Sequence, residues 1–209
     1  MHPSVLSRIA QEIGQKADAK ERFIFKWRPF ICPFHLLLEY IPEGACVLDV
    51  GCGSGLWLLL LSRLGRIRKG IGMDVNPERI ALANNLRTER DELQFLEANE
   101  EEDWPKGKAD CLTMIDVLHH VPKGKQKAFL GRIESTQASR VIFKDIDPAA
   151  RIRRTMNTLH DWVLSRQIPQ YSAPEEVISR LREMGYDAGY IIRHDMLWYR
   201  HYLIVADKK

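Results

Sequence analysis

Apolar residues form short strand-like runs that alternate with helix-like spacings between residues 45 and 146. The expected strands cover Cys46–Val50, Gly70–Asp74, Leu93–Leu96, Cys111–Ile115 and Arg140–Ile146. The expected helices cover Leu56–Leu64, Pro77–Arg87 and Lys123–Ser135. Strands that alternate with helices are typical of a parallel sheet with helices on both faces. The pattern therefore predicts an α/β fold.

The two ends of the chain depart from this alternation. At the N-terminus, apolar residues spaced as on one helix face predict a helix over Ser4–Lys16, and Phe34–Tyr40 fits another. The aromatic-rich segment between them, 23–30, either staples one edge of the sheet or covers the substrate. At the C-terminus, an amphipathic helix over Pro174–Met184 stops at Gly185 and precedes two strands over Tyr186–His194 and Tyr199–Asp207, which predict a closing hairpin.

A glycine-rich loop follows the first expected strand. Gly51, Gly53 and Gly55 form a G-x-G-x-G pattern, and Leu56 stands where the dinucleotide fingerprint has its third glycine. Side chains at Gly51 and Gly53 would keep a ligand away from backbone amides. Asp49, just ahead of the loop, would repel a pyrophosphate and attract a cationic ligand. The loop therefore favours a positively charged nucleotide-like ligand over a nicotinamide dinucleotide.

A second carboxylate follows at the end of the next strand. Asp74 comes 19 residues after Gly55, close to the interval of about 20 expected for an acid that binds ribose hydroxyls. Its alternative role is to cap the helix that begins at Pro77, for which Asn76 is better suited.

These residues resemble the class I S-adenosylmethionine-dependent methyltransferase family over about 45–146. The resemblance implies a Rossmann-like, doubly wound, mostly parallel seven-stranded sheet with an antiparallel C-terminal strand and helices on both faces. It implies S-adenosylmethionine as the cofactor, with Asn99 near the adenine and Asp116 near the methionine end. The cofactor-binding residues expected on this basis are Asp49, Gly51, Cys52, Gly53, Gly55, Asp74, Val75, Asn99 and Asp116.

The length of 209 residues, 45% of them hydrophobic, fits one globular domain over 1–209. Its expected parts are an N-terminal helical arm or lid (1–44), a cofactor-binding core (45–146), a substrate-covering insertion (147–173) and a C-terminal helix with a strand hairpin (174–209).

Two histidines are candidates for a general base. His119 lies in a Leu-His-His-Val segment after the fourth expected strand, where ligands of open parallel sheets bind. His160 lies in an expected helix between the fifth strand and the Pro174 helix. An imidazole has an unperturbed pKa of about 6.5, so either could accept a proton from a nucleophile. A structural role remains open for both.

Polar residues gather between the fifth strand and the Pro174 helix. The candidate substrate-binding residues are Lys144, Asp145, Arg151, Asp161 and Tyr171. Arg151 belongs to a basic cluster that could bind a carboxylate or a phosphate, including that of a carrier protein's phosphopantetheine arm, or could simply be solvated. The segments Trp27-Arg28-Pro29-Phe30 and Lys144-Asp145 together are similar to small bacterial methyltransferases of aryl-polyene and fatty-acyl biosynthesis.

Composition narrows the classes of partner. A net charge of +3 in 209 residues is too mild for a chain that tracks phosphates, so we expect no nucleic-acid partner. The four cysteines lack paired ligand spacing, which predicts no metal site and a reduced, intracellular protein. The longest apolar run, Leu56–Leu61, is far too short to span a membrane. A cytoplasmic location is expected.

The sequence therefore predicts an enzyme that transfers a methyl group from S-adenosylmethionine to a small aromatic or acyl acceptor, free or bound to a carrier protein. Two alternatives stay open: a non-catalytic scaffold that binds the cofactor, and a nicotinamide-dependent oxidoreductase.

Overall fold

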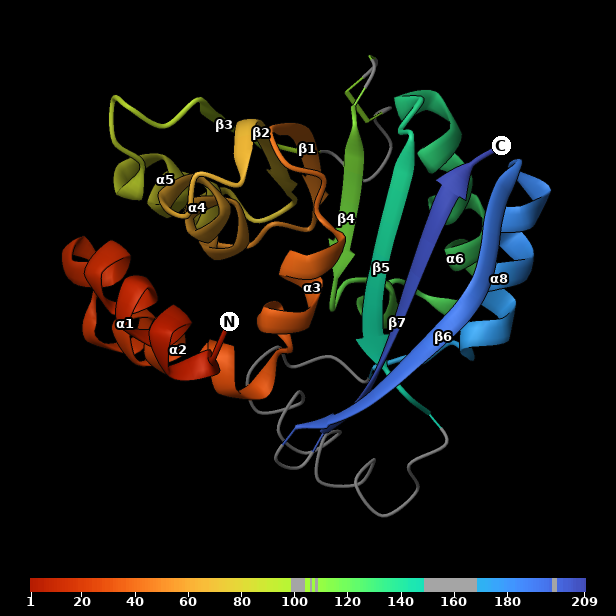
Figure 1. Cartoon of the computed structure of the whole chain (residues 1–209), viewed down its shortest axis with the longest axis horizontal. Coiled ribbons are helices and arrows are strands. Elements are labelled where there is room, and N and C mark those ends of the chain that lie inside the picture. Colours follow the sequence, from red (N-terminus) through yellow and green to blue (C-terminus); the bar gives the residue numbers. More distant parts are fainter. Residues whose placement is uncertain (99–103, 106, 108, 149–168, 197–198) are drawn as a thin grey trace. The chain divides into compact units, whose positions relative to one another are not determined.

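The computed structural model describes residues 1–98, 104–105, 107, 109–148, 169–196 and 199–209 (Figure 1). The chain divides into two compact units. Unit 1 comprises Met1–Glu102 and Ala109–Thr113, and unit 2 comprises Asp103–Lys108 and Met114–Lys209. The boundary between the units falls within one strand, Cys111–Ile115.

The strands form a Rossmann-like sheet with the order β3-β2-β1-β4-β5-β7-β6. β1 pairs parallel with β2, and β2 pairs parallel with β3, whereas β7 runs antiparallel to both β5 and β6. This arrangement confirms the predicted fold class and its antiparallel C-terminal strand. The strands are β1 (Ala45–Val50), β2 (Ile67–Asp74), β3 (Leu93–Glu97), β4 (Cys111–Ile115), β5 (Arg140–Ile146), β6 (Tyr186–Met196) and β7 (Tyr199–Lys208).

Helices pack on the strands in each unit. The α-helices are α1 (Pro3–Ile13), α2 (Ala19–Ile31), α3 (Phe34–Tyr40), α4 (Leu56–Arg63), α5 (Pro77–Leu86), α6 (Lys123–Gly131) and α8 (Pro174–Glu183). Short 3-10 turns cover Gly14–Lys16 (η1), Leu118–His120 (η2) and Arg132–Thr136 (η3).

The core of unit 1 is built around α4. Every residue from Leu56 to Leu61 is buried, so this helix is apolar on all sides, as expected for one enclosed by other elements. It packs on β2 and β3, α5 packs on the same two strands, and α1 packs on α4 and α2.

The core of unit 2 lies between α8 and the strand pair β6–β7. Val177 and Leu181 of α8 are fully buried, as is Tyr186 at the start of β6. The Tyr186 hydroxyl donates a hydrogen bond of 2.8 Å to the Ala138 carbonyl, which satisfies the polar end of this buried ring.

The main departure from the expected elements is in the N-terminal arm. The aromatic segment 23–30 lies inside α2, whose N-terminus is capped by Asp18 through a hydrogen bond of 2.8 Å from the Glu21 amide. Only part of the segment staples the core, because Phe25 is buried while Phe23 and Trp27 are exposed.

The helix expected over Lys123–Ser135 also ends early. Its α-helical part stops at Gly131 and continues as the 3-10 turn η3. The hydroxyls of Ser135 and Thr136 donate to the carbonyls three residues before them, at 2.8 and 2.7 Å. Such side-chain bonds compete with the α-helical pattern, which explains the tighter turn.

Candidate functional site

The glycine loop of unit 1 connects β1 to α4 and is anchored to β2. The Gly51 and Cys52 amides donate to the Met73 carbonyl at 2.7 and 3.0 Å. Gly53 and Gly55 have φ angles of 55° and 76°, a region that favours glycine. The loop therefore needs glycines for its own conformation, whatever it binds.

Gly53 and Gly55 differ in what surrounds them. A Cβ on Gly55 would lie 2.7 Å from the Phe95 ring and 2.9 Å from the Ala83 Cβ, so this glycine permits close packing of the loop on α5 and β3. A Cβ on Gly53 would meet only the Arg79 guanidinium, at 4.0 Å. Gly53, in contrast to Gly55, is therefore a position at which a ligand could approach the loop backbone.

Asp74 ends β2 and is held by the backbone. Its Oδ2 accepts the Gly53 amide at 2.8 Å, and its Oδ1 accepts the Asn76 amide at 2.9 Å. Asn76 in turn caps α5, as expected, by accepting the amides of Glu78 and Arg79. A carboxylate has about four lone-pair sites, so Asp74 keeps acceptor capacity for a pair of hydroxyls.

Asp49 is buried in unit 1. Its Oδ1 accepts a hydrogen bond of 2.6 Å from the Thr113 hydroxyl. Burial raises the pKa of Asp49 from 3.8 to about 7; the bond from Thr113 opposes this shift, and the charge of Asp74 adds to it. A cation bound beside Asp49 would favour its ionised form.

The other two predicted cofactor residues of this loop region differ in exposure. Cys52 is partly buried, and burial followed by the charges of Asp49 and Asp74 raises the pKa of its thiol, so the thiol is unreactive. Val75 is 58% exposed, which is unusual for an apolar side chain and leaves its surface available for contact.

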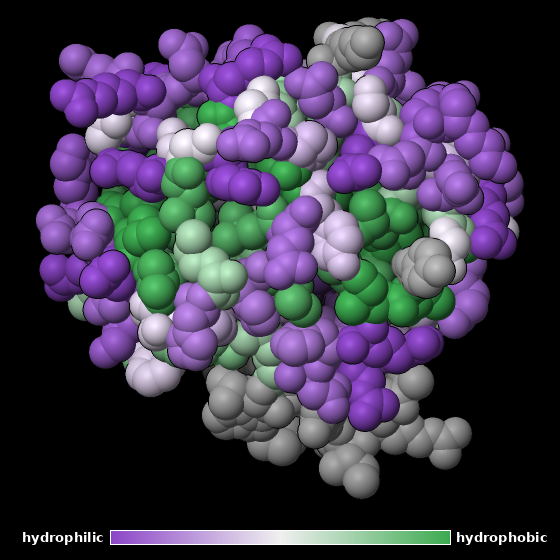
Figure 2. All heavy atoms as spheres, viewed as in Figure 1, coloured by the Kyte–Doolittle hydropathy of each residue, from purple (hydrophilic) through white to green (hydrophobic). Residues whose placement is uncertain are grey.

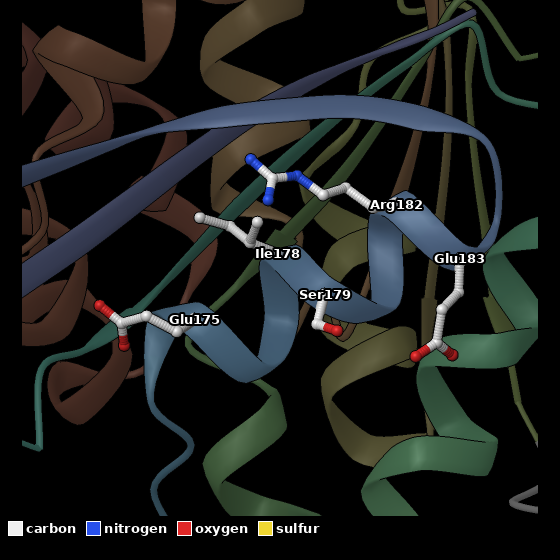
Figure 3. Close-up of a pocket in the computed structure, with 5 residues that line it drawn as sticks. All are labelled: Glu175, Ile178, Ser179, Arg182 and Glu183. Carbon is white, nitrogen blue, oxygen red and sulfur yellow. The ribbon is translucent and has the colours of Figure 1, made fainter.

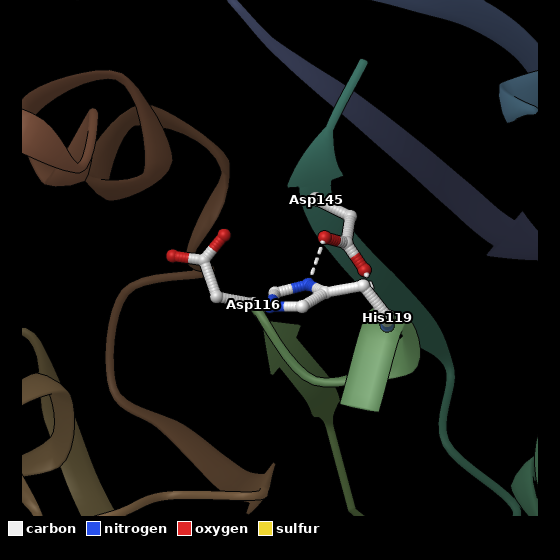
Figure 4. Close-up of side chains that lie close together, drawn as sticks. All are labelled: Asp116, His119 and Asp145. Carbon is white, nitrogen blue, oxygen red and sulfur yellow. Dashed lines mark hydrogen bonds and ion pairs between the residues drawn. The ribbon is translucent and has the colours of Figure 1, made fainter. Parts of the chain in front are cut away.

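Unit 2 gathers Asp116, His119 and Asp145 after β4 and within β5 (Figure 4). Asp145 Oδ1 lies 2.5 Å from His119 Nδ1 and also accepts the Ile146 amide at 2.8 Å. Both His119 and Asp145 are 3% exposed. Because a carboxylate only accepts hydrogen bonds, this contact places the proton of a neutral His119 on Nδ1.

Lys144 and Asp116 form a second charged pair in the same unit. Lys144 Nζ lies 2.5 Å from Asp116 Oδ1, and the lysine side chain is fully buried. Asp116 has a φ angle of 58°, which is unusual for a residue other than glycine. The pair neutralises two charges that would otherwise be costly to bury.

Three ligand atoms of Asp116, His119 and Asp145 lie within 4.8 Å of one another, close enough to share a metal ion. The Lys144 ammonium already contacts Asp116. The Lys144 side chain thus supplies the positive charge that a metal ion would bring. The arrangement therefore fits a cluster of ion pairs.

The remaining predicted site residues divide into two groups. Tyr171 is half-buried, and its ring centroid lies 5.8 Å from that of His119. Asn99, Arg151, His160 and Asp161 lie outside the described residues. Sequence reasoning did not identify Thr113 or Gln126, although both are buried polar residues next to predicted site residues.

Gln126 shapes the segment that carries His119. Its side-chain amide donates to the carbonyls of Leu118, Val121 and Gln170, at 3.0, 3.0 and 2.7 Å. A glutamine on the inward face of an amphipathic helix is the sequence signal that could have indicated this role.

A hollow on α8 contains none of the predicted residues (Figure 3). Its lining is Glu175, Ile178, Ser179, Arg182 and Glu183. Arg182 donates to the Ala188 carbonyl at 2.9 Å, so it joins α8 to β6. All five lining residues belong to α8. Among the described residues, no helix combines the length and apolar character that crossing a membrane requires.

Comparisons with known proteins place this chain in a family. The methyltransferase domain model matches residues 22–188. The ubiquinone biosynthesis O-methyltransferase of Albidiferax ferrireducens is 31% identical over 133 residues, which cover 58% of this chain and 53% of that protein. The enzyme of the same name from Xanthomonas axonopodis is 34% identical over 110 residues, which cover 43% of this chain and 42% of that protein. The chain thus spans about half the length of the curated relatives it matches.

Solved structures share the fold at low sequence identity. A putative methyltransferase in complex with the Trm112 activator from Haloferax volcanii has a TM-score of 0.72, with 17% identity, over 93% of this chain and 96% of that one. The magnesium protoporphyrin IX methyltransferase of Synechocystis with bound S-adenosylhomocysteine has a TM-score of 0.69, with 16% identity, over 99% of this chain and 96% of that one. With most of its length matched by the family model, the chain belongs to the methyltransferase domain family.

Proposed function

We propose that this protein transfers a methyl group from S-adenosylmethionine to a hydroxyl oxygen of a small aromatic or acyl acceptor. The observation that carries the proposal is Asp74, whose carboxylate is fixed by the amide of Gly53, a loop position with open space around it. Family membership supports the reaction class, and a Synechocystis neighbour of the same fold was solved with S-adenosylmethionine bound.

In this proposal unit 1 binds the cofactor, which supplies a methyl group on a positively charged sulfur. Asp74 accepts the two ribose hydroxyls with the lone pairs that its backbone bonds leave, and Gly53 allows close approach. Asp49 supplies negative charge that favours the cation. Contacts by Gly51, Gly55, Val75 and Asn99 remain predictions, as does a contact of Asp116 with the methionine end.

His119 is the proposed general base. Asp145 holds the Nδ1 proton, so Nε2 is the nitrogen with a lone pair, and this nitrogen accepts the proton of the acceptor hydroxyl as the methyl group is transferred. Asp145 is then a positioning residue. Lys144 is fully buried against Asp116, so we propose a positioning role for it in place of the substrate contact expected from the sequence.

The acceptor class rests on several weaker observations. Relatives named for ubiquinone biosynthesis favour a phenolic hydroxyl. Tyr171, beside His119, could contact an aromatic ring. Binding of an acidic or phosphopantetheine-linked group by Arg151 and Asp161, and a role of His160 as an alternative base, remain proposals.

Transfer from methyl-labelled cofactor to a panel of phenols and acyl thioesters, read by mass spectrometry, tests the activity. We expect His119→Ala to lower the turnover rate at saturating cofactor by about 10²- to 10⁴-fold and to leave the affinity for S-adenosylhomocysteine unchanged. His120→Ala is the matched control, because His120 is the exposed neighbour. A loss in His160→Ala with full activity in His119→Ala would overturn the assignment of the base.

The cofactor role of Asp74 has a separate readout. Asp74→Asn replaces one acceptor oxygen with an NH₂ group, which would face a backbone amide or a ribose hydroxyl. We expect binding of S-adenosylhomocysteine to weaken by about 1 to 3 kcal/mol in isothermal titration calorimetry. The control is Asp187→Asn, at an exposed site on β6. Binding of NADH in place of S-adenosylhomocysteine would favour an oxidoreductase, and cofactor binding without any transfer would favour a scaffold.

A further inference from the structure

One face of α2 exposes large aromatic side chains that the core does not use. Phe23 is 64% exposed and Trp27 is 43% exposed, whereas Phe25 and Pro29 of the same helix are buried. At 100° per residue, Phe23, Trp27 and Phe30 lie on the side opposite to the buried pair.

The three rings form a continuous stripe, which we call the aromatic stripe. The ring centroids of Phe23 and Trp27 are 6.2 Å apart, and those of Trp27 and Phe30 are 5.7 Å apart. On the face seen in Figure 2, hydrophobic residues reach the surface in the region of the N-terminal helices, among hydrophilic ones. Exposed apolar surface of this kind, rimmed by charge, marks an interaction site.

Basic residues flank the aromatic stripe. Lys20 and Lys26 are exposed and fall about 60° to either side of Phe23 on the helix circumference. The Lys26 ammonium lies 5.4 Å from the centre of the Trp27 ring. Within α2, Glu21 is the only acidic residue, against four basic ones. The face is therefore aromatic at its centre and positively charged at its margins.

This combination matches the surface of a bilayer that contains anionic lipids. Aromatic rings insert at the boundary between headgroups and acyl chains, while lysines extend their ammonium groups to the phosphates. An acidic protein partner would satisfy the lysines and leave the aromatic stripe without an apolar counterpart. With 13 residues, α2 is too short to cross the hydrocarbon core, so it would lie in the plane of the interface.

We propose that α2 is a membrane-docking helix that places unit 1 on an anionic lipid surface. The helix is tied to the rest of the unit without using the aromatic stripe. The Ser7 hydroxyl of α1 donates to the Lys26 carbonyl at 2.7 Å, and the Ser54 hydroxyl of the glycine loop donates to Glu21 at 3.2 Å. Docking thus needs no unfolding of the helix.

Flotation of the full chain with vesicles tests the proposal independently of catalysis. We expect binding to phosphatidylcholine vesicles that contain phosphatidylglycerol, and much weaker binding to phosphatidylcholine alone. Phe23→Ala with Trp27→Ala should lower the partition coefficient by about tenfold or more. Lys20→Glu with Lys26→Glu should lower it by at least about tenfold, and added salt should weaken wild-type binding.

The matched control for charge is Lys69→Glu with Lys127→Glu, which alters two exposed lysines outside α2 and should change binding little. Circular dichroism verifies that each variant is folded. Equal vesicle binding by the wild type and the aromatic variant would overturn the proposal. So would a wild-type dimer in sedimentation velocity that the aromatic variant converts to a monomer, because the aromatic stripe would then join two copies.

Discussion

Asp49 combines a buried carboxyl group with a pKa near neutrality. In the folded protein burial raises this pKa from 3.8 to about 7. A raised carboxyl pKa means that the folded state holds its proton more tightly than the unfolded chain does. The contribution of Asp49 to stability is therefore fully present below about pH 4 and is lost as the pH rises through 7.

Asp49→Asn should remove this loss of stability. An amide oxygen still accepts the bond from Thr113, and no charge is buried. The free energy of unfolding of the variant, relative to the wild type, should rise between pH 5 and pH 8, by an amount on the order of 4 kcal/mol at most. Urea denaturation of both proteins at each pH measures this difference. Parallel pH profiles for the two proteins would contradict the assigned pKa.

The buried pair of Lys144 and Asp116 allows a double-mutant cycle. Lys144→Met leaves the Asp116 carboxylate without its closest cation, and we expect a loss of about 3 to 5 kcal/mol in the free energy of unfolding. Lys144→Met combined with Asp116→Asn should recover much of that loss, because the uncompensated charge is gone. Additive effects of the two substitutions in urea denaturation would show that the pair is not coupled.

At the scale of single residues, the sequence indicates backbone requirements more directly than side-chain contacts. The loop glycines and Asp74 could be identified because backbone conformation and spacing along the chain define them. The contact between Asp145 and His119 joins residues 26 positions apart and depends on how two segments pack. Lys144 reads as a polar substrate residue in the sequence, and its burial is visible only in the structure.

Among the elements, α5 has the clearest terminal signal. The Asn76 side chain accepts the Glu78 and Arg79 amides at 3.0 and 3.1 Å, and Pro77 occupies the first turn. Asn76→Ala should lower the free energy of unfolding by about 1 kcal/mol. Asn76→Gly should cost less, since glycine retains the extended conformation of a cap. Thermal denaturation compares the two, and equal stability of Asn76→Ala and wild type would show that the cap contributes nothing.

Strands β4 and β5 were easier to predict than helix α2. The runs that became β4 and β5 had the same bounds in the prediction and in the structure, because continuous apolar stretches with polar ends mark buried parallel strands. The segment that became α2 carries apolar residues on two opposite faces, so its helical period is hidden. This helix, whose pattern is hidden, also carries an apolar face that the core does not use.

At the scale of the whole molecule, the sequence predicts a single domain, and the chain divides into two compact units. Strand β4 belongs to both, because Cys111–Thr113 falls in unit 1 and Met114–Ile115 in unit 2. Melting either unit would disrupt part of β4, whose five residues are all buried. We therefore expect the chain to unfold in one cooperative transition, with equal calorimetric and van't Hoff enthalpies.

A matched pair of cavity-forming variants tests this cooperativity. Leu59 of α4 in unit 1 and Ile204 of β7 in unit 2 are both fully buried, and truncation to alanine should cost about 2 to 5 kcal/mol at either site. If the units unfold together, Leu59→Ala and Ile204→Ala each shift the entire heat-capacity peak and leave one peak. If the units unfold independently, each variant lowers the melting temperature of only its own unit and splits the peak in two. That splitting would refute the single-domain organisation.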